Sequence, residues 1–206
     1  MMNLQQKVVG VVLAGGRSRR FGSAKAFAPL AGTNLIGHVV ARAAPQVSRL
    51  LLSADGDPRF AALGLPLVAD DVKEHDGAGA GPLAGILAAL DWLAAREPDT
   101  RWLATFAVDT PLLPEDMVER LRAAAEREGA EIACGRSAGR LHPLQTLWST
   151  ALRASLRAAL TTGERAVHRF AEQRRLAVVD FPAETFDPFA NVNTPADLER
   201  LAQLLG

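Results

Sequence analysis

Apolar runs alternate with stretches of helical periodicity along this chain of 206 residues. Three short runs are almost wholly apolar, at 8–14 (VVGVVLA), 49–54 (RLLLSA) and 102–108 (WLATFAV). Such runs are typical of strands buried on both faces of a sheet. Weaker strand patterns occur at 66–69, 130–134, 144–148 and 176–181.

Helices are predicted between these strands. Three of them begin at a proline, a residue favoured at the first helical position: Pro82, Pro114 and Pro195. Thr194 is the predicted N-cap of the last one, with Asp197 three residues later. The apolar faces are formed by Leu83, Ile86, Leu87, Leu90 and Ala94, then by Met117, Leu121 and Ala124, and finally by Leu198, Leu201 and Leu205.

Strands that alternate with helices predict an α/β fold with a mainly parallel sheet, and the absence of a clean linker predicts one domain over 1–206. In such sheets the active crevice lies outside the carboxyl ends of the strands. The loops to inspect are therefore 14–25, 53–59, 69–82 and 109–113.

The composition of the chain argues against nucleic-acid-binding and membrane-spanning proteins. Hydrophobic residues make up 49% of the chain, and 23 basic side chains balance 23 acidic ones. This balance argues against a nucleic-acid partner, because such proteins normally carry a basic surface. The single Cys134 fits a reducing compartment, and no apolar run is long enough to span a bilayer. We expect a cytoplasmic protein with no membrane partner.

The loop after the first strand concentrates cations behind two glycines. Gly15 and Gly16 allow close approach to the main chain, and four basic side chains follow, which are Arg17, Arg19, Arg20 and Lys25. This pattern favours a triphosphate cradle, although an ordinary glycine turn with a solvated basic face gives the same letters. The loop is neither a Walker A motif nor a dinucleotide fingerprint.

Asp109 follows an apolar strand and precedes TPLLP. An acid at this position suits Mg²⁺, an ion that keeps several waters and uses substrate phosphates, but an acid that caps a turn is an equal alternative from the residues alone. Asn191 and Asn193, in NVNTP, could supply a further oxygen or serve the turn before the last helix.

The sequence resembles the molybdenum cofactor guanylyltransferases of the MobA type. The segments that carry the resemblance, from about residue 10 to 200, are LAGGRSRRFGSAK (13–25), GAGAGPLAGI (77–86), AVDTPLLP (107–114), GRLHPLQTLW (139–148) and FANVNTPADL (189–198). The resemblance implies a Rossmann-like three-layer sandwich of the nucleotidyltransferase type. Two departures are Ala24, where the family has an acid, and Ser53, where several members have asparagine.

The resemblance also implies site residues. It carries over Arg20 and Lys25 as the groups that hold the triphosphate, and Asp109 as the Mg²⁺ ligand. Asp71 becomes a candidate contact to the guanine base, although a solvated acidic turn is the alternative. The implied nucleotide contacts are Leu13, Ala14, Gly15, Gly16, Lys25, Ser53, Asp71, Gly81 and Asp109.

A second substrate follows from the same resemblance. It would be molybdopterin, whose terminal phosphate needs cations across the cleft. The candidate residues for binding this second substrate are Arg140, His142, Arg165, Asn191 and Asn193. His142 could equally be a satisfied turn histidine. A molybdoenzyme or its chaperone is a further partner for cofactor delivery.

The implied reaction transfers GMP from GTP to molybdopterin and releases pyrophosphate. The segments Leu13-Ala14-Gly15-Gly16 and GPLAG at 81–85 favour GTP over the CTP of the sister cytidylyltransferases. A GTP-binding regulatory module without catalysis is the alternative from another class, and Ala24 is the feature that favours it.

Overall fold

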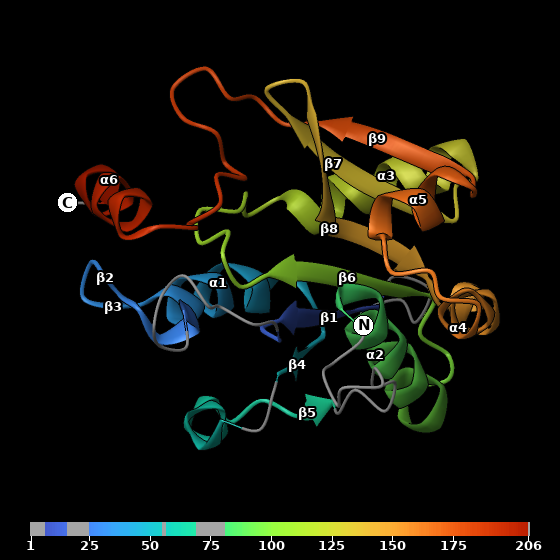
Figure 1. Cartoon of the computed structure of the whole chain (residues 1–206). Coiled ribbons are helices and arrows are strands. Elements are labelled where there is room, and N and C mark those ends of the chain that lie inside the picture. The colour runs from blue at the N-terminus through green and yellow to red at the C-terminus, as the bar shows by residue number, and fades with distance from the viewer. Residues whose placement is uncertain (1–6, 16–24, 55–56, 69–80, 206) are drawn as a thin grey trace.

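A computed structural model describes residues 7–15, 25–54, 57–68 and 81–205 (Figure 1). Its centre is a seven-stranded sheet in the order β5-β4-β1-β6-β8-β7-β9. The strands are β1 (Val8–Leu13), β4 (Arg49–Ser53), β5 (Leu67–Val68), β6 (Trp102–Ala107), β7 (Ile132–Ser137), β8 (Arg140–Ser149) and β9 (Leu176–Asp180). All run in one direction except β8, which is antiparallel to both neighbours.

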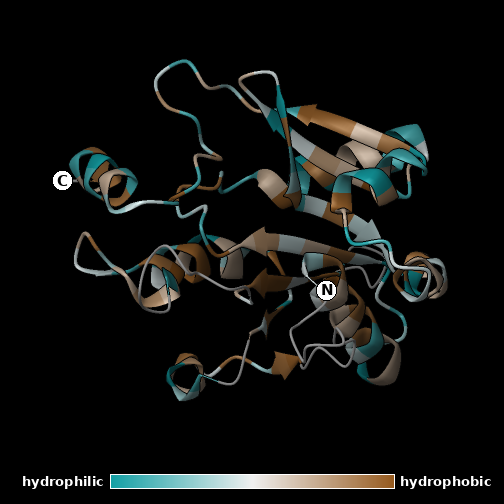
Figure 2. Cartoon of the chain, viewed as in Figure 1, coloured by the Kyte–Doolittle hydropathy of each residue, from teal (hydrophilic) through white to brown (hydrophobic). Residues whose placement is uncertain are grey.

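The middle of the sheet is apolar on both faces because helices cover both sides. Every residue of β1 and of β6 is buried. Val8 and Val12 face one helical layer, whereas Val9 and Val11 face the other. Figure 2 shows the resulting hydrophobic colour concentrated along these central strands. The arrangement confirms the predicted three-layer α/β sandwich with a mainly parallel sheet.

Six α-helices surround this sheet within the described residues. They are α1 (Leu35–Ala43), α2 (Pro82–Arg96), α3 (Met117–Glu128), α4 (Arg153–Thr161), α5 (Val167–Glu172) and α6 (Pro195–Leu205). Helices α1 and α3 share one core cluster with the sheet, and α2, α4 and α5 share the other. Helix α6 packs against the small hairpin of β2 (Pro29–Leu30) and β3 (Thr33–Asn34), away from the main layers (Figure 1).

Several predicted details differ in the structure. The helix expected from Pro114 begins at Met117, because Arg42 and Gln46 donate hydrogen bonds to the carbonyls of Leu113 and Pro114. Ala94 is exposed rather than apolar-facing. Trp92 of the same helix is half-buried, with the guanidinium groups of Arg49 and Arg96 over its ring.

The antiparallel strand β8 arises from a tight hairpin. Ala138 and Gly139 connect β7 to β8, and their φ angles of 47° and 75° are both left-handed. This geometry matches the two-residue turn whose twist suits antiparallel strands. The hairpin brings β8 back beside β6, so polar side chains of β8 reach the carboxyl end of β6.

Candidate active site

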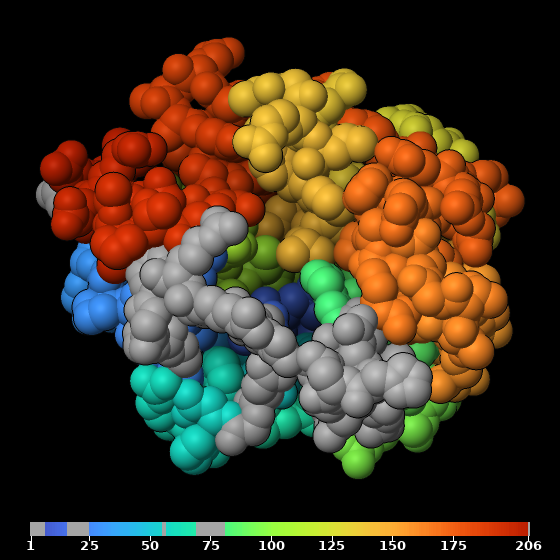
Figure 3. Space-filling model, viewed as in Figure 1, coloured from blue at the N-terminus to red at the C-terminus, as the bar shows by residue number. Residues whose placement is uncertain are grey.

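Three neighbouring strands end in one row and define the floor of the site. Leu13 of β1 stands in register with Ser53 of β4 and with Ala107 of β6. The main chain stays paired one residue further, since Ala14 N donates to Ser53 O at 2.8 Å and Val108 N to Leu13 O at 3.2 Å. Figure 3 shows a hollow on this face, with dark blue atoms of the β1 region on its floor and the light green start of α2 beside it.

Lys25 lies where three distant segments meet. It begins a short 3-10 turn, Lys25–Phe27, and its Nζ donates to Asp109 Oδ2 at 2.9 Å and to Asn193 Oδ1 at 3.0 Å. The Lys25 and Asp109 side chains are only 11% and 22% exposed, so this ion pair is partly shielded from water. The structure therefore brings together the lysine, the acid and the second asparagine of the sequence prediction.

The loop that carries Asp109 is fixed through its main chain. Thr110 N donates to Ala107 O at 3.2 Å and closes a turn, and Val192 N donates to Asp109 O at 2.9 Å. The side chain of Asn191 does not reach Lys25 in the described contacts; its Oδ1 accepts from Thr110 Oγ1 at 3.1 Å. The two asparagines thus have different surroundings, which the sequence could not distinguish.

Asn193 is held by the cap of α6. Asp197 Oδ2 accepts from Asn193 N at 3.0 Å and Thr194 N at 2.9 Å, while Thr194 Oγ1 accepts from Asp197 N at 3.2 Å. These bonds confirm the predicted capping role of Thr194. The N–H donor of Asn193 lowers the pKa of Asp197, so the carboxylate is charged at neutral pH. The cap therefore fixes the backbone from which Asn193 reaches Lys25.

The first turn of α2 approaches the ends of β1 and β4. Gly81 begins the helix with φ of 80°, a left-handed conformation that favours glycine. A Cβ on Gly85 would lie 2.6 Å from Ser53 Oγ and 3.1 Å from Leu13 Cδ2. Glycine at 85 is thus required for this approach, which places Gly81 and Ser53 on one side of the site.

Several predicted site residues lie outside the described residues. They are Gly16, Arg17, Arg19, Arg20 and Asp71. Of the first loop, the structure describes Leu13, Ala14, Gly15 and Lys25, and Gly15 is exposed. The cradle of arginines and the acid expected at the base remain predictions.

His142 belongs to a polar cluster at the tip of the β7–β8 hairpin. Its Nε2 is 2.7 Å from Ser137 Oγ, which donates to Asp187 Oδ1 at 2.5 Å. The His142 ring also packs on Phe189, with centroids 4.8 Å apart. Burial is the main cause that lowers the pKa of His142, so the ring is neutral at pH 7. The histidine is satisfied within the fold, which was one of the two alternatives.

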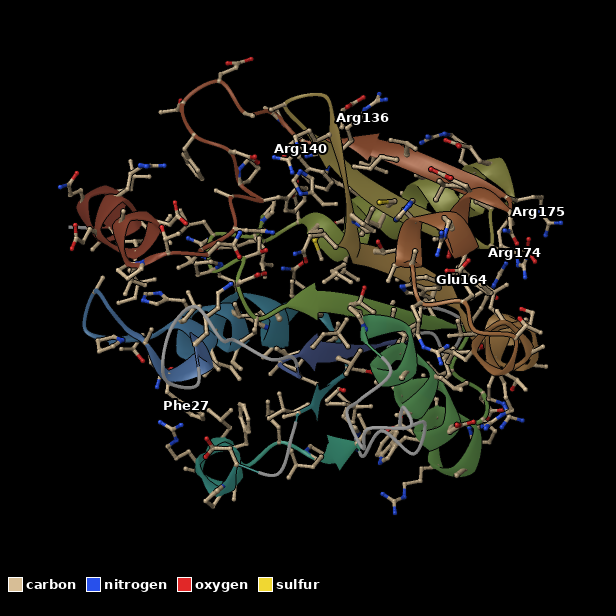
Figure 4. The ribbon with its side chains drawn as sticks, in the orientation of Figure 1. Phe27, Arg136, Arg140, Glu164, Arg174 and Arg175 are labelled. Carbon is tan, nitrogen blue, oxygen red and sulfur yellow. The ribbon has the colours of Figure 1, made fainter. Side chains whose placement is uncertain are left out.

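The two predicted arginines of the second-substrate site are not neighbours. Arg140 is exposed on the hairpin, whereas Arg165 Nη1 donates to the carbonyls of Leu160 and Glu164 at 2.9 Å each. Figure 4 labels Arg140 and Glu164 far apart in the view. Arg165, adjacent to Glu164 in the chain, thus lies at the end of α4 and not on the hairpin.

Two oxygen atoms at Lys25 suit a hard divalent cation. The Asp109 carboxylate and the Asn193 amide oxygen both lie within 3.0 Å of one ammonium group. Mg²⁺ accepts such oxygens and takes its other ligands from water and phosphates. No cluster of three or more His, Cys, Asp or Glu side chains suited to a metal occurs among the residues that the structure describes. A magnesium ion held by Asp109 and Asn193 would take further ligands from water and substrate phosphates.

Sequence reasoning missed the buried polar residues behind the site. Gln145 is 2% exposed and Thr110 is fully buried, and they are hydrogen-bonded to each other at 2.9 Å. The signal available in the sequence was one amide in the apolar stretch LQTLW and a hydroxyl directly after Asp109.

No helix among the described residues has the length and apolar character needed to cross a membrane.

Comparisons with known proteins identify the family of the chain. The family described as the MobA-like NTP transferase domain matches residues 10–178. A curated molybdenum cofactor guanylyltransferase of Rhodopseudomonas palustris (strain BisB5) is 47% identical over 198 residues, which cover 93% of this chain and 92% of the relative.

Two solved structures share the fold. The molybdopterin-guanine dinucleotide biosynthesis protein A of Archaeoglobus fulgidus superposes with a TM-score of 0.73 at 25% identity, over 95% of this chain and 97% of that one. A Mycobacterium tuberculosis protein solved in complex with manganese gives a TM-score of 0.70 at 20% identity, over 96% of this chain and 98% of that one.

Proposed function

This chain belongs to the MobA-like NTP transferase family, and we propose that it transfers GMP from GTP to the terminal phosphate of molybdopterin. The products are molybdopterin guanine dinucleotide and pyrophosphate. The relatives named as molybdenum cofactor guanylyltransferases support this assignment because the match spans nearly the whole length of both chains. The protein is thus a nucleotidyltransferase, and its buried free thiol at Cys134 is compatible with the cytoplasm.

The observation that carries the proposal is the meeting of Lys25, Asp109 and Asn193. A lysine ammonium is a compact charge that binds phosphate well. Lys25 would bind the triphosphate of Mg²⁺-GTP, and Asp109 and Asn193 would hold the metal, so each charged side chain would exchange one opposite charge for another. The Lys25–Asp109 ion pair keeps both groups at the site before the nucleotide arrives.

A bound Mg²⁺ would offset negative charge on the phosphate oxygens of the nucleotide. The residues of the chain supply the rest. Lys25, with Arg20 from the same loop, stabilises the charge that develops on the departing pyrophosphate. The main chain at Leu13, Ala14 and Gly15 and the start of α2 at Gly81 position the nucleotide.

Catalysis then depends on alignment and electrostatics. The attacking phosphate of molybdopterin is already an anion, so no general base and no covalent intermediate on the enzyme are required. The β7–β8 hairpin with Arg140 and the segment 181–194 lie at the same edge of the sheet as Asp109. We assign this side to molybdopterin and, after transfer, to the molybdoenzyme or chaperone that receives the cofactor.

Nucleotide-dependent pyrophosphate release tests the proposal. The purified protein is given molybdopterin and Mg²⁺ with either GTP or CTP, and we expect pyrophosphate with GTP only. Release with CTP alone would identify a cytidylyltransferase, and GTP binding without release would identify a regulatory module. Lys25→Met is the matched variant, and we expect it to weaken GTP binding in calorimetry by about 10- to 100-fold, the loss of one charge-assisted contact to phosphate.

A further inference from the structure

We infer that Gln145 and Thr110 are positioning residues for Asp109. They clamp the turn that carries this acid and join it to the segment that carries Asn193. The inference rests on the proposed function, because it assigns a role toward the same nucleotide site. Neither side chain reaches Lys25 in the described contacts, so both act through the groups they hold.

Gln145 replaces main-chain pairing at the point where β6 leaves the sheet. The ladder between β6 and β8 ends at the pair Thr105 and Thr146. At the residue of β8 that precedes Thr146, Gln145 Oε1 accepts from Ala107 N at 3.3 Å, and Gln145 Nε2 donates to Thr110 Oγ1 at 2.9 Å. The side-chain amide of Gln145 therefore binds the turn that carries Asp109 at both ends, at Ala107 and at Thr110.

Thr110 extends the clamp to the other segment. Its hydroxyl accepts from Gln145 and donates to Asn191 Oδ1 at 3.1 Å, so its proton and a lone pair are both used. Val192 N donates to Asp109 O at 2.9 Å, beside this bond. The result is a chain of hydrogen bonds that runs from Gln145 of β8 through Thr110 to Asn191, two residues before Asn193.

The clamp matters because, among the described residues, one side-chain hydrogen bond holds the Asp109 carboxylate. It comes from Lys25, a group that would bind the triphosphate. Once Lys25 turns to phosphate, the direction of the carboxylate depends on its backbone, and that backbone is fixed by Gln145, Thr110 and Val192. Outer groups that orient a metal ligand are worth about 10- to 100-fold in metal affinity or activity.

Thr110→Val and Thr110→Ser test the inference in the full-length protein. Valine keeps the shape and removes the hydroxyl, whereas serine keeps the hydroxyl. We expect Thr110→Val to lower kcat by about 10- to 100-fold and to weaken Mn²⁺ binding to the protein–GTP complex, with KM for GTP little changed. Thr110→Ser should restore most of both. Mn²⁺ binding is measured by electron paramagnetic resonance and does not require turnover.

Thr105→Val is the matched control for simple loss of a buried hydroxyl. Thr105 is also fully buried on β6, donates to Thr146 O at 3.1 Å and accepts from Trp148 Nε1 at 3.4 Å, but it lies inside the sheet. We expect this variant to unfold at lower urea concentration while its folded form keeps the kcat and Mn²⁺ affinity of the parent.

The inference is overturned if Thr110→Val keeps the parent's kcat and Mn²⁺ affinity, or if Thr105→Val loses both equally. Gln145→Met is a second variant, and its effect should not add to that of Thr110→Val, because each breaks the same chain of bonds. If the parent protein itself transfers no nucleotide, the proposed function fails, and the Mn²⁺ comparison between valine and serine still decides the positioning role.

Discussion

The N-terminal half of the molecule (residues 7–113) and the C-terminal half (114–205) contribute different kinds of groups to one site. The N-terminal half supplies the charges: Asp109 just after the fully buried strand β6, and Lys25 at the start of a 3-10 turn. The C-terminal half supplies neutral amides, with Asn193 at Lys25 and Gln145 and Asn191 around Thr110.

This difference suggests that the two halves have separate functions, one in binding and the other in orientation. Charges bind phosphate and metal directly, so their removal takes away the interaction that lowers the barrier. Neutral amides orient what they contact, and the buried amide of Gln145 gains directional specificity from the low dielectric around it. The predictions below exploit matched residues from the two halves.

The largest expected effect is from Asp109→Asn, in the N-terminal half. The variant keeps the shape of the side chain and removes the charge that we propose holds the metal. We expect kcat for guanylyl transfer to fall by about 10³-fold or more. Because the ion pair is largely buried, the variant leaves Lys25 without its charge partner and should cost up to about 3–5 kcal/mol in the free energy of unfolding. Transfer assays and urea denaturation check the two statements, and near-parental turnover would refute the role of Asp109.

Asn193→Ala is the corresponding change in the C-terminal half. It removes one neutral oxygen from Lys25, and we expect kcat to fall by about 10- to 100-fold, less than for Asp109→Asn. Asn193→Asp keeps the oxygen and should recover Mn²⁺ affinity. Titration of activity with Mg²⁺ measures both variants. An effect of Asn193→Ala as large as that of Asp109→Asn would contradict the division between the halves.

Gly10 and Gly135, one in each half, allow the effect of a packing defect on stability to be separated from its effect on turnover. A Cβ on Gly10 would lie 2.8 Å from Phe106 Cε2 and 2.9 Å from Leu50 Cδ1, and one on Gly135 would lie 2.9 Å from Phe189 Cε2. Each alanine variant should lose about 1–3 kcal/mol in the free energy of unfolding, because the added methyl group would overpack its site. Urea denaturation measures this loss.

Turnover should separate the two alanine variants. Gly10 lies inside the central sheet, so the folded Gly10→Ala protein should keep its kcat. Phe189 belongs to the segment that leads to Asn193, and its N–H donates to Asp187 Oδ1 at 2.9 Å. Gly135→Ala should therefore also lower kcat, by about 10-fold, as expected for small misplacement of reacting groups. Equal kcat values in the two variants would show that the segment is not coupled to the site.

The smallest effect concerns His142 and pH. Its pKa is lowered chiefly by burial, with Arg140 lowering it and Asp187 raising it. The unfolded chain therefore takes up a proton before the folded chain as pH falls below about 6.5. The free energy of unfolding should decrease over that interval and show no contribution from His142 above it.

The variant His142→Gln isolates this contribution because it keeps a donor for Ser137 Oγ. We expect its free energy of unfolding to depend less on pH than that of the parent between pH 7 and 5, as measured by urea denaturation at each pH. A steeper loss in the variant than in the parent would show that the sign is wrong.

The sequence predicted the N-terminal half better than the C-terminal half for a physical reason. A strand buried on both faces is apolar throughout, so the polar residue after it, such as Asp109, is conspicuous. The N-terminal half also has exceptions, because neither the cap of α1 at Asn34 nor the small hairpin that contains Thr33 was predicted. The start of α3 was placed too early because the carbonyls of Leu113 and Pro114 accept bonds from Arg42 and Gln46 of a distant segment.

The role of Gln145 could not be predicted because it depends on tertiary pairing. One polar residue in a strand pattern is ordinary alternation unless the neighbour of that strand is known. Only the antiparallel return of β8 beside β6 brings Gln145 to Thr110. The same limit applies to Asn191 and Asn193, which are equivalent in the sequence and have different partners in the structure.

A crystal structure of the protein with a non-hydrolysable GTP analogue and Mn²⁺ tests the central claim, that both halves serve one nucleotide. The account predicts an anomalous manganese peak within coordination distance, about 2 Å, of the Asp109 carboxylate and the Asn193 oxygen. It also predicts that Lys25 Nζ turns from Asp109 to a phosphate oxygen. An intact Lys25–Asp109 pair, with metal and triphosphate bound elsewhere, would contradict the account.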